Sequence, residues 1–444
     1  MSTPDRLTAK LDQLTGVEQR DKRYPSLAAA VLRDGELIWE KAVGSADVEA
    51  GGEATPDTQY RVGSITKTFT AAAIMQLRDA GKLDFEDTLD MHVEGAAYRP
   101  SIRRLLSHAS GLQRETHDDS WLTLRFAPPD ELLETLDRAE MVLPAGARFH
   151  YSNLAFALLG IVIERVSGQP YADYVREHFF EPLGLVRMSF DPEAPAAKGY
   201  VAEPFADGVW EAVNVETGAW TSAGQLWGTA GDLCRWGAFL MEPDETLLAK
   251  KSAEEMRTVQ VIQEHERWLW GYGLGLQLYR DGERILAGHG GSMPGFIARL
   301  FFSPRDKVVL AALTNESSAA LVPFGAGLVR TTVEEWPVAP EPWRVGASPP
   351  EDVIPLLGIW FMEASQFALR WRDGRLEARS PDDTDWQPPS VFEKETEDRW
   401  RTVSGPEHGE ALKIVRGEDG TVERLVWAGY PVTREPGPWH APEQ

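Results

Sequence analysis

A serine and a lysine three residues apart are the first candidates for covalent chemistry in this sequence. Ser64 and Lys67 lie in the run Arg61-Val-Gly-Ser-Ile-Thr-Lys-Thr-Phe, and residues three apart on a helix share one face. A serine hydroxyl is a weak nucleophile until a neighbouring base removes its proton. Lysine can be that base only where its site lowers its pKa. The spacing predicts a nucleophilic pair, against the alternative of a capping serine beside an exposed lysine.

Two further segments bring polar groups that such a nucleophile needs. Tyr151 and Asn153 precede an apolar helix; the phenol can relay a proton for a lysine, and the amide can hold both the lysine and a substrate carbonyl. Their alternative roles are a core tyrosine and a helix-capping amide. The run His289-Gly290-Gly291-Ser292 ends a predicted strand. Its glycines leave room for a substrate strand and expose backbone N–H groups to an oxyanion, although a simple strand-ending turn also explains them.

The surrounding pattern predicts the elements that hold these groups. We expect a hairpin around Asp34-Gly35, a helix over 64–80 closed by Gly81 and a helix over 153–166 closed by Gly168. Further strands are predicted at 272–279, 284–289, 298–302 and 308–314. Strands, a long helical middle and returning strands indicate an α+β fold: an antiparallel sheet flanked by helices, with an inserted all-helical lobe.

The length of 444 residues indicates two domains. Residues 336–350 carry five prolines and are interpreted as a linker. Residues 1–335 then form the catalytic domain. Beyond the linker, short alternating runs turn at Asp373-Gly374 and Asp419-Gly420, which predicts a small antiparallel β-barrel over 351–444.

The composition of the chain limits the kinds of partner that we expect for this protein. The formal net charge of −24 repels phosphate backbones and mildly favours cationic or zwitterionic substrates, so we expect no nucleic-acid partner. One cysteine, Cys234, excludes an internal disulfide. The first ten residues lack an apolar leader, and the strongest apolar run, 154–163, is half the length that crosses a bilayer. We expect a cytoplasmic protein with no membrane partner.

Other catalytic classes lack their motifs. The nine histidines form no H-x-x-H or H-x-x-x-H pair, so we expect no metal site and no cofactor. An α/β-hydrolase requires a G-x-S-x-G elbow, and the sequence has none.

Taken together, the three motifs resemble the serine β-lactamase and penicillin-binding-protein superfamily, of the peptidase S12 type. The resemblance covers roughly residues 20–335 and includes the blocks Leu105-Leu-Ser-His-Ala-Ser-Gly-Leu, Ser222-Ala-Gly-Gln-Leu-Trp-Gly-Thr, Trp270-Gly-Tyr-Gly-Leu-Gly and Leu313-Thr-Asn. It implies that Ser64 attacks the acyl carbon, that Lys67 and Tyr151 move protons, and that Asn153 orients Lys67 and the substrate amide. His289 belongs to the catalytic set, and oxyanion and substrate binding fall to Ser64, Gly290, Gly291 and Ser292.

Two departures shift the expected substrate. The Tyr-x-Asn pattern resembles class C members, but His-Gly-Gly stands where drug-degrading members have Lys-Thr-Gly. That lysine helps to hold a β-lactam carboxylate, and a mostly neutral His289 holds it less well. Similar variants occur in esterases, D-amino-acid peptidases, amidases and thioesterases that cyclise nonribosomal peptides.

The C-terminal block resembles the lipocalin-like domain of some D-peptidases and of those cyclising thioesterases. In it, Arg434 follows the last predicted strand and is a candidate to bind a carboxylate or carbonyl of the acyl residue; the alternative is a surface arginine paired with an acid.

We therefore expect a thioesterase or peptide cyclase that prefers a D-residue at the acyl site. Its substrate would be a small molecule or peptide, including a thioester or carrier-protein-bound peptide. The alternatives are hydrolysis by a D-stereospecific peptidase, amidase or esterase, and a non-catalytic sensor that retains the fold.

Overall fold

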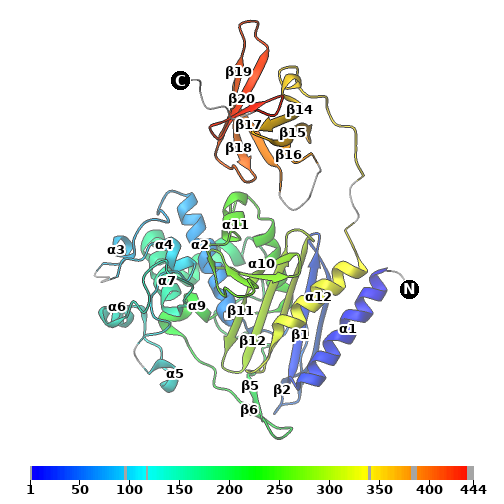
Figure 1. Cartoon of the computed structure of the whole chain (residues 1–444). Coiled ribbons are helices and arrows are strands. Elements are labelled where there is room, and N and C mark those ends of the chain that lie inside the picture. The colour runs from blue at the N-terminus through cyan, green and yellow to red at the C-terminus, as the bar shows by residue number, and fades with distance from the viewer. Residues whose placement is uncertain (1–2, 95–97, 117–118, 339–341, 382–387, 438–444) are drawn as a thin grey trace. The chain divides into compact units, whose positions relative to one another are not determined.

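The chain divides by its internal contacts into two units, Met1–Val338 and Ala339–Gln444. The computed structural model describes residues 3–94, 98–116, 119–338, 342–381 and 388–437. Figure 1 shows a large sheet packed among helices in the first unit, and a small β-structure in the second.

The first unit is built on nine antiparallel strands in the order β3-β2-β1-β13-β12-β11-β10-β9-β8. The bounds are β1 Ser26–Arg33, β2 Glu36–Asp47, β3 Gly52–Glu53, β8 Val261–Ile262, β9 Trp270–Tyr272, β10 Gln277–Asp281, β11 Arg284–Met293, β12 Phe296–Ser303 and β13 Val308–Thr314. Short pairs outside this sheet are β4 Tyr60–Arg61 with β7 Trp227–Gly228, and β5 Tyr200–Ala202 with β6 Val209–Glu211. The Asp34-Gly35 turn has positive φ at both residues, 49° and 83°, as a tight hairpin requires. The antiparallel sheet predicted from the sequence is confirmed.

Helices cover both faces of the sheet (Figure 1). The helix bounds are α1 Thr3–Lys22, α2 Thr66–Asp79, α3 Leu89–His92, α4 Ile102–Leu106, α5 Ser120–Thr123, α6 Pro129–Glu134, α7 Asn153–Ser167, α8 Tyr171–Val175, α9 Thr221–Gly224, α10 Ala230–Met241, α11 Lys250–Met256 and α12 Leu321–Glu335. Helices α1 and α12 share one apolar core with the sheet, and α2, α7 and α10 share the other. The predicted helical lobe is formed by the helices from α3 to α9. Within the described ranges, none of the helices combines the length and hydropathy that a membrane crossing needs.

One predicted strand is divided in the structure. Residues 272–279 were expected to be continuous, but β9 ends at Tyr272 and β10 begins at Gln277. The two strands pair with each other, Gln277 opposite Tyr272. Between them Gly275 has a φ of 73°, and a Cβ there would lie 2.2 Å from the Cβ of Ala71 in α2. Gly275 of this turn therefore packs directly against α2, where a larger residue would not fit.

Close backbone packing brings β11 beside the turn that holds Ser64. This turn is the short 3₁₀ helix η1, Gly63–Ile65, which leads into α2. A Cβ on Gly291 would lie 1.8 Å from the carbonyl oxygen of Val62, and a Cβ on Gly63 would lie 2.8 Å from the Ser292 nitrogen. Only glycine fits at such distances, so these two positions fix the gap between the strand and the nucleophile.

The second unit is a closed eight-stranded barrel, so the predicted antiparallel barrel is confirmed. Its strands are β14 Gly358–Met362, β15 Ser365–Arg372, β16 Arg375–Arg379, β17 Ser390–Thr396, β18 Arg399–Ser404, β19 Ala411–Arg416, β20 Val422–Trp427 and β21 Tyr430–Thr433. Trp360, Trp400 and Trp427 are buried in its interior. The Trp360 indole donates to the Leu356 carbonyl at 2.6 Å, which satisfies its polar edge.

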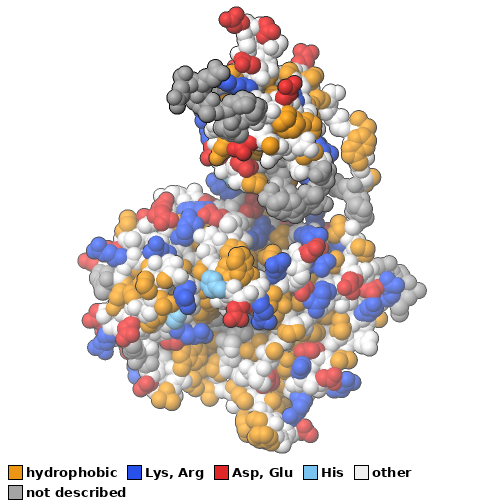
Figure 2. Space-filling model, in the orientation of Figure 1, with side chains coloured by type: hydrophobic (Ala, Val, Ile, Leu, Met, Phe, Trp, Pro, Cys, Tyr) orange, Lys and Arg blue, Asp and Glu red, His pale blue; other side chains and the backbone are white. Residues whose placement is uncertain are grey.

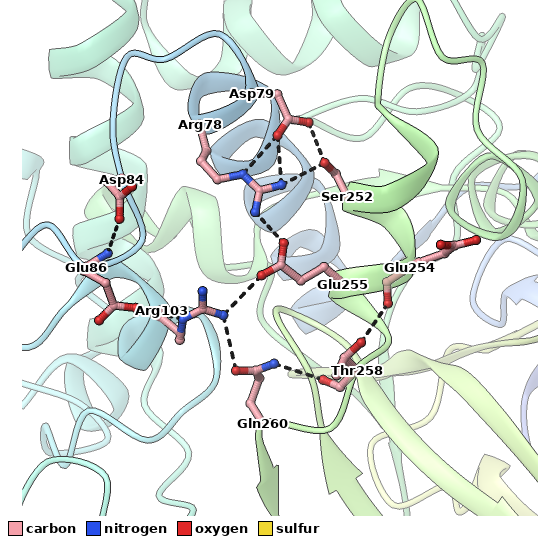
Figure 3. Close-up of polar contacts among 10 residues, drawn as sticks. All are labelled: Arg78, Asp79, Asp84, Glu86, Arg103, Ser252, Glu254, Glu255, Thr258 and Gln260. Atoms are coloured by element: carbon pink, nitrogen blue, oxygen red, sulfur yellow. Dashed lines mark hydrogen bonds and ion pairs between the residues drawn. The ribbon is translucent and has the colours of Figure 1, made fainter. Parts of the chain in front are cut away.

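A polar network ties the far end of α2 to neighbouring elements (Figure 3). The Arg78 guanidinium donates to Ser252 Oγ at 2.8 Å and also binds Glu255. It lies 4.3 Å from the centre of the Phe85 ring. Arg103 of α4 reaches Glu255 from the other side at 3.2 Å. Because α2 begins beside Ser64, the network anchors the helix that carries the candidate site.

We expect Arg78→Ala to lower the free energy of unfolding by about 2 kcal/mol, because it removes hydrogen bonds to a charged partner and packing on Phe85. Chemical denaturation measures this change. Arg267→Ala is the matched control: Arg267 is 76% exposed and pairs only loosely with Glu264 at 3.7 Å, so it should change stability by less than about 0.5 kcal/mol. Equal effects of the two variants would contradict the anchoring role.

We expect Gly291→Ala to displace β11 from Val62 and to slow labelling of Ser64 by a serine-directed phosphonate at least about 10²-fold. The labelling rate is read by intact-mass measurement. Gly16→Ala in α1, where a Cβ meets nothing within 4 Å, is the control and should label at the native rate. Normal labelling of Gly291→Ala would show that the strand gap does not control the site.

Candidate active site

Ser64 and Lys67 meet as the spacing predicted. Lys67 Nζ lies 3.0 Å from Ser64 Oγ and donates a hydrogen bond to the Ala223 carbonyl at 2.7 Å. Lys67 is completely buried. The 3₁₀ turn places the serine at the start of α2 and the lysine in its first helical turn, so the helix geometry itself creates the contact.

Burial decides the charge of the lysine. Desolvation lowers the pKa of Lys67 well below its ordinary value; Glu115 opposes the shift and Arg114 adds to it. A neutral amine that touches a serine hydroxyl can accept its proton. Burial thus shifts Lys67 toward the neutral form that a general base requires.

Tyr151 directly precedes the N-cap of α7. Ser152 is that cap, because its side chain accepts from the Ala155 backbone at 3.0 Å. The Tyr151 ring centre lies 5.1 Å from Lys67 Nζ. Burial raises the pKa of Tyr151 to about 12, although a hydrogen bond with Ser64 lowers it. The structure therefore favours the protonated phenol, and the proton relay expected of Tyr151 stays a prediction.

Asn153 lies on the same wall, but its amide is directed at an acid that sequence reasoning missed. Its side-chain N–H donates to Glu115 Oε1, and its backbone N–H donates to the Arg114 carbonyl at 2.8 Å. Among the described residues, the hydrogen bonds of Lys67 Nζ go to Ser64 and Ala223. The expected orientation of Lys67 by Asn153 therefore stays a prediction, and the observed orientation comes from a backbone carbonyl.

His289 is neutral and fixed in one tautomer. Its Nδ1 lies 2.6 Å from the Gly290 carbonyl and must donate to it, so Nε2 accepts from the Tyr272 hydroxyl at 3.0 Å. Burial, together with the nearby Lys67, lowers the pKa of His289 to about 3. At this position the motif therefore supplies no positive charge.

The two glycines after His289 make room for atoms of the protein itself. Gly291 faces Val62, as described above, and a Cβ on Gly290 would lie 2.4 Å from the Arg299 guanidinium. The Gly290 N–H donates to Gln277 Oε1 at 3.2 Å. Oxyanion binding by the N–H of Ser292 stays a prediction. Ser292 is exposed at the cavity.

These groups line one cavity of about 860 Å³, whose walls include Ser64, Glu115, Tyr151, Asn153, His289 and Arg299. On the face of the molecule shown in Figure 2, acidic and basic side chains are intermingled. In the described ranges, no three His, Cys, Asp or Glu side chains cluster as a metal site would require.

Arg434 makes contacts within the barrel. Its guanidinium donates to the carbonyls of Ile359 at 3.0 Å and Pro355 at 2.6 Å, and it lies 3.7 Å from the centre of a Trp360 ring. These contacts give Arg434 a structural place in the second unit. Its binding of substrate stays a prediction.

Sequence reasoning missed Glu115, Tyr272, Gln277 and Arg299. Tyr272 stands in a block that was noted for its resemblance, but nothing in its spacing linked it to His289. Arg299 lies directly opposite Gly290 in the β11–β12 register, and that register could be read only from the folded sheet.

Known proteins share this architecture. A domain of unknown function, DUF7586, matches residues 349–434. Beta-lactamase-like protein 2 of Dictyostelium discoideum is 29% identical over 290 residues; the match covers 61% of this chain and 52% of that protein, so the chain spans about half of its relative's length.

Two solved structures are similar to the fold. A D-stereospecific amidohydrolase from Streptomyces sp. has a TM-score of 0.62 and 26% identity over 73% of this chain and 98% of its own. A protein named SurE has a TM-score of 0.62 and 25% identity over 98% of this chain and 99% of its own. The beta-lactamase family matches residues 7–330, which include the Ser64–Lys67 pair, Tyr151 and His289, and the chain belongs to that family of serine hydrolases.

Proposed function

We propose that this protein is a serine acyl-transfer enzyme that cleaves peptide-like amide or ester bonds through an acyl-Ser64 intermediate, with a D-configured residue at the acyl position. The observation that carries the proposal is the 3.0 Å contact between Ser64 Oγ and the buried Lys67 amine. The similarity to a D-stereospecific amidohydrolase supports the stereochemical preference.

The steps of acylation follow from the protonation states of Lys67 and Tyr151. The neutral Lys67 amine takes the proton of Ser64 as Oγ bonds to the acyl carbon. The backbone N–H groups of Ser64 and Ser292 stabilise the oxyanion. When the bond to the leaving group breaks, the Tyr151 hydroxyl donates a proton to that group, and the lysine ammonium returns one to Tyr151.

Deacylation can use water or an amine, and we favour water. Polar side chains, among them Arg114, Glu115, Gln263 and Gln277, line the cavity beside apolar ones such as Phe149 and Ile297. Cyclisation by the substrate's own N-terminus, the outcome expected from the sequence, needs a drier site, since water competes for the acyl-enzyme. We therefore favour a D-stereospecific hydrolase. Intact Ser64 and Lys67 argue against the non-catalytic sensor.

Ser64→Ala should abolish labelling by a fluorophosphonate and lower kcat/KM by about 10⁴-fold or more, because no other group can form the acyl-enzyme. Intact-mass measurement locates the adduct, and circular dichroism verifies folding. If folded native protein forms no adduct on Ser64, the sensor alternative gains and the acyl-enzyme is refuted.

Two kinds of compound test the substrate preference of the enzyme. They are matched D- and L-aminoacyl amides, and a peptidyl thioester with a D-residue at the acyl position. We expect a kcat/KM ratio of D over L above about 10, and linear acid as the main product of the thioester by mass spectrometry. A preference for L would contradict the stereochemical part of the proposal. A cyclic main product would instead identify the peptide cyclase.

The acylation rate should rise with pH. Only neutral Lys67 accepts the proton, so the rate should fall about tenfold per pH unit below the pKa of Lys67, which burial sets well under 10.5. Stopped-flow acylation by an activated ester measures the profile. The pKa of His289 is about 3, so His289 does not titrate between about pH 5 and pH 9. The substitution His289→Gln should therefore leave the midpoint of the pH–rate profile unchanged in that range. A midpoint near the ordinary lysine pKa would contradict Lys67 as the base.

A further inference from the structure

The Ala223 carbonyl is the second hydrogen-bond partner of the proposed base. Lys67 Nζ donates to it at 2.7 Å and lies 3.0 Å from Ser64 Oγ. A neutral amine has a single lone pair, and this lone pair must face Ser64 Oγ to accept its proton. Because the bond to the carbonyl fixes the orientation of the amine, the position of Ala223 decides where the lone pair points.

The segment around Ala223 is held on both sides. Ala223 lies in the short helix α9. On its N-terminal side, the Ser222 carbonyl accepts from Thr70 Oγ1 of α2 at 2.6 Å, and Ser222 Oγ donates to the Phe156 carbonyl of α7 at 2.9 Å. On its C-terminal side the contacts come from Gln225. A displacement on either side would move the Ala223 carbonyl.

The side-chain oxygen of Gln225 collects several donors. Gln225 Oε1 accepts from Arg61 Nη2 at 2.8 Å, from Thr217 Oγ1 at 2.7 Å and from the Thr217 backbone N–H at 3.1 Å. The side-chain N–H of Gln225 donates to the Phe190 carbonyl at 2.9 Å. Gln225 is buried, and hydrogen bonds shielded from water are stronger than exposed ones. Gln225 therefore fixes the chain directly after α9.

Arg61 is a buried cation that forms no ion pair within the described ranges. It is 1% exposed, and its Nη1 and Nη2 donate to Asn214 Oδ1 and Gln225 Oε1, both at 2.8 Å. Its Nε is sealed from solvent without a partner. Desolvation lowers the pKa of Arg61 to about 10. A buried cation without an acid costs stability, so its bonds to two neutral amides indicate a role other than stabilisation.

The place of Arg61 in the chain indicates that role. Arg61 ends β4, three residues before Ser64, and it pairs with Trp227 of β7. Through β4 the arginine is joined to the turn that holds Ser64, and through Gln225 it is joined to the segment that holds Ala223. One side chain therefore connects the nucleophile to the carbonyl that orients the base.

We propose that Arg61 and Gln225 act together as positioning residues, which hold the Ala223 carbonyl so that the lone pair of Lys67 points at Ser64 Oγ. The proposal rests on the proposed acyl-enzyme function and adds to it the groups that orient its base. Neither Arg61 nor Gln225 lines the catalytic cavity. Their loss should therefore slow proton transfer and leave the reversible binding of a ligand unchanged.

The test is the labelling of Ser64 by a fluorophosphonate, followed by intact-mass measurement over time and reagent concentration. This separates the maximal labelling rate, kinact, from reversible binding, KI. In Gln225→Ala and Arg61→Met we expect kinact to fall about 10²-fold, as for a catalytic group misplaced by about 1 Å, with KI within about twofold of native. A native kinact in either folded variant, or a loss confined to KI, would overturn the proposal.

Matched controls remove the same chemical groups elsewhere in the first unit. Arg33→Met deletes another buried arginine, whose guanidinium lies 5.6 Å from the centre of the Trp336 ring. Gln76→Ala deletes an amide that donates to the Leu247 carbonyl at 2.7 Å and accepts from the Tyr174 hydroxyl at 3.1 Å. Both variants should keep the native kinact, even where they lower the free energy of unfolding. A fall in kinact as large as that of Gln225→Ala would show that any lost buried contact disturbs the site, and would refute a specific role.

Two further variants test whether the residues act as one unit. Arg61→Lys keeps a cationic donor beside Gln225 and should label at least about tenfold faster than Arg61→Met. The double variant Arg61→Met/Gln225→Ala should lose no more than the slower single variant, because groups that act as a unit are not additive. Additive losses, or a folded Arg61→Lys as slow as Arg61→Met, would contradict the joint role.

Failure of the proposed function is distinguishable from failure of this inference. If the folded native protein forms no adduct on Ser64, the acyl-enzyme itself is refuted. If the native protein is labelled and both Gln225→Ala and Arg61→Met label at the native kinact, the acyl-enzyme stands and the positioning role is refuted. Circular dichroism verifies that each variant is folded.

Discussion

The structure of the catalytic unit depends on one buried contact, that between the Lys67 amine and the Ser64 hydroxyl. A lysine inside a protein is tolerated when its charge is removed and its polar atom is bonded. Here desolvation lowers the pKa of Lys67, which favours the neutral amine, and Ser64 and the Ala223 carbonyl provide the bonds. The same burial that costs folding energy therefore favours the form of the lysine that can accept a proton. For that reason α2 has to be packed on all sides, and its residues from Thr66 to Met75 are all buried.

Two glycines set the distance between β11 and the turn that holds Ser64. Gly63 and Gly291 permit backbone contacts that no side chain would allow, so β11 passes close to the nucleophile. The neutral His289 joins β11 to Tyr272 of β9 through one hydrogen bond, and its ring lies 6.3 Å from that of Tyr151. The histidine thus links β11 to β9, and its neutral ring supplies no charge for a substrate.

Two charged side chains, Glu115 and Arg299, line the same cavity as Ser64 and Tyr151. Burial lowers the pKa of Lys67 and raises the pKa of Tyr151, and both shifts favour the neutral form of the side chain. Glu115 raises and Arg299 lowers the pKa of Tyr151, so the phenol senses both charges. In the second unit, the Arg434 guanidinium donates to the carbonyls of Ile359 and Pro355, which belong to the same unit.

The sequence alone was enough to predict the fold class, the hairpin at Asp34-Gly35 and the contact of Ser64 with Lys67, because turn residues, helical spacing and strand alternation are local properties of the chain. It also pointed to Tyr151, Asn153 and His289 through their motifs. Only the tertiary structure decided that Tyr151 keeps its proton, that Asn153 bonds to Glu115 and that Arg299 fills the space beside Gly290. Burial and strand register bring together residues that are distant in the chain, and desolvation, which sets their protonation, has no signature in residue spacing.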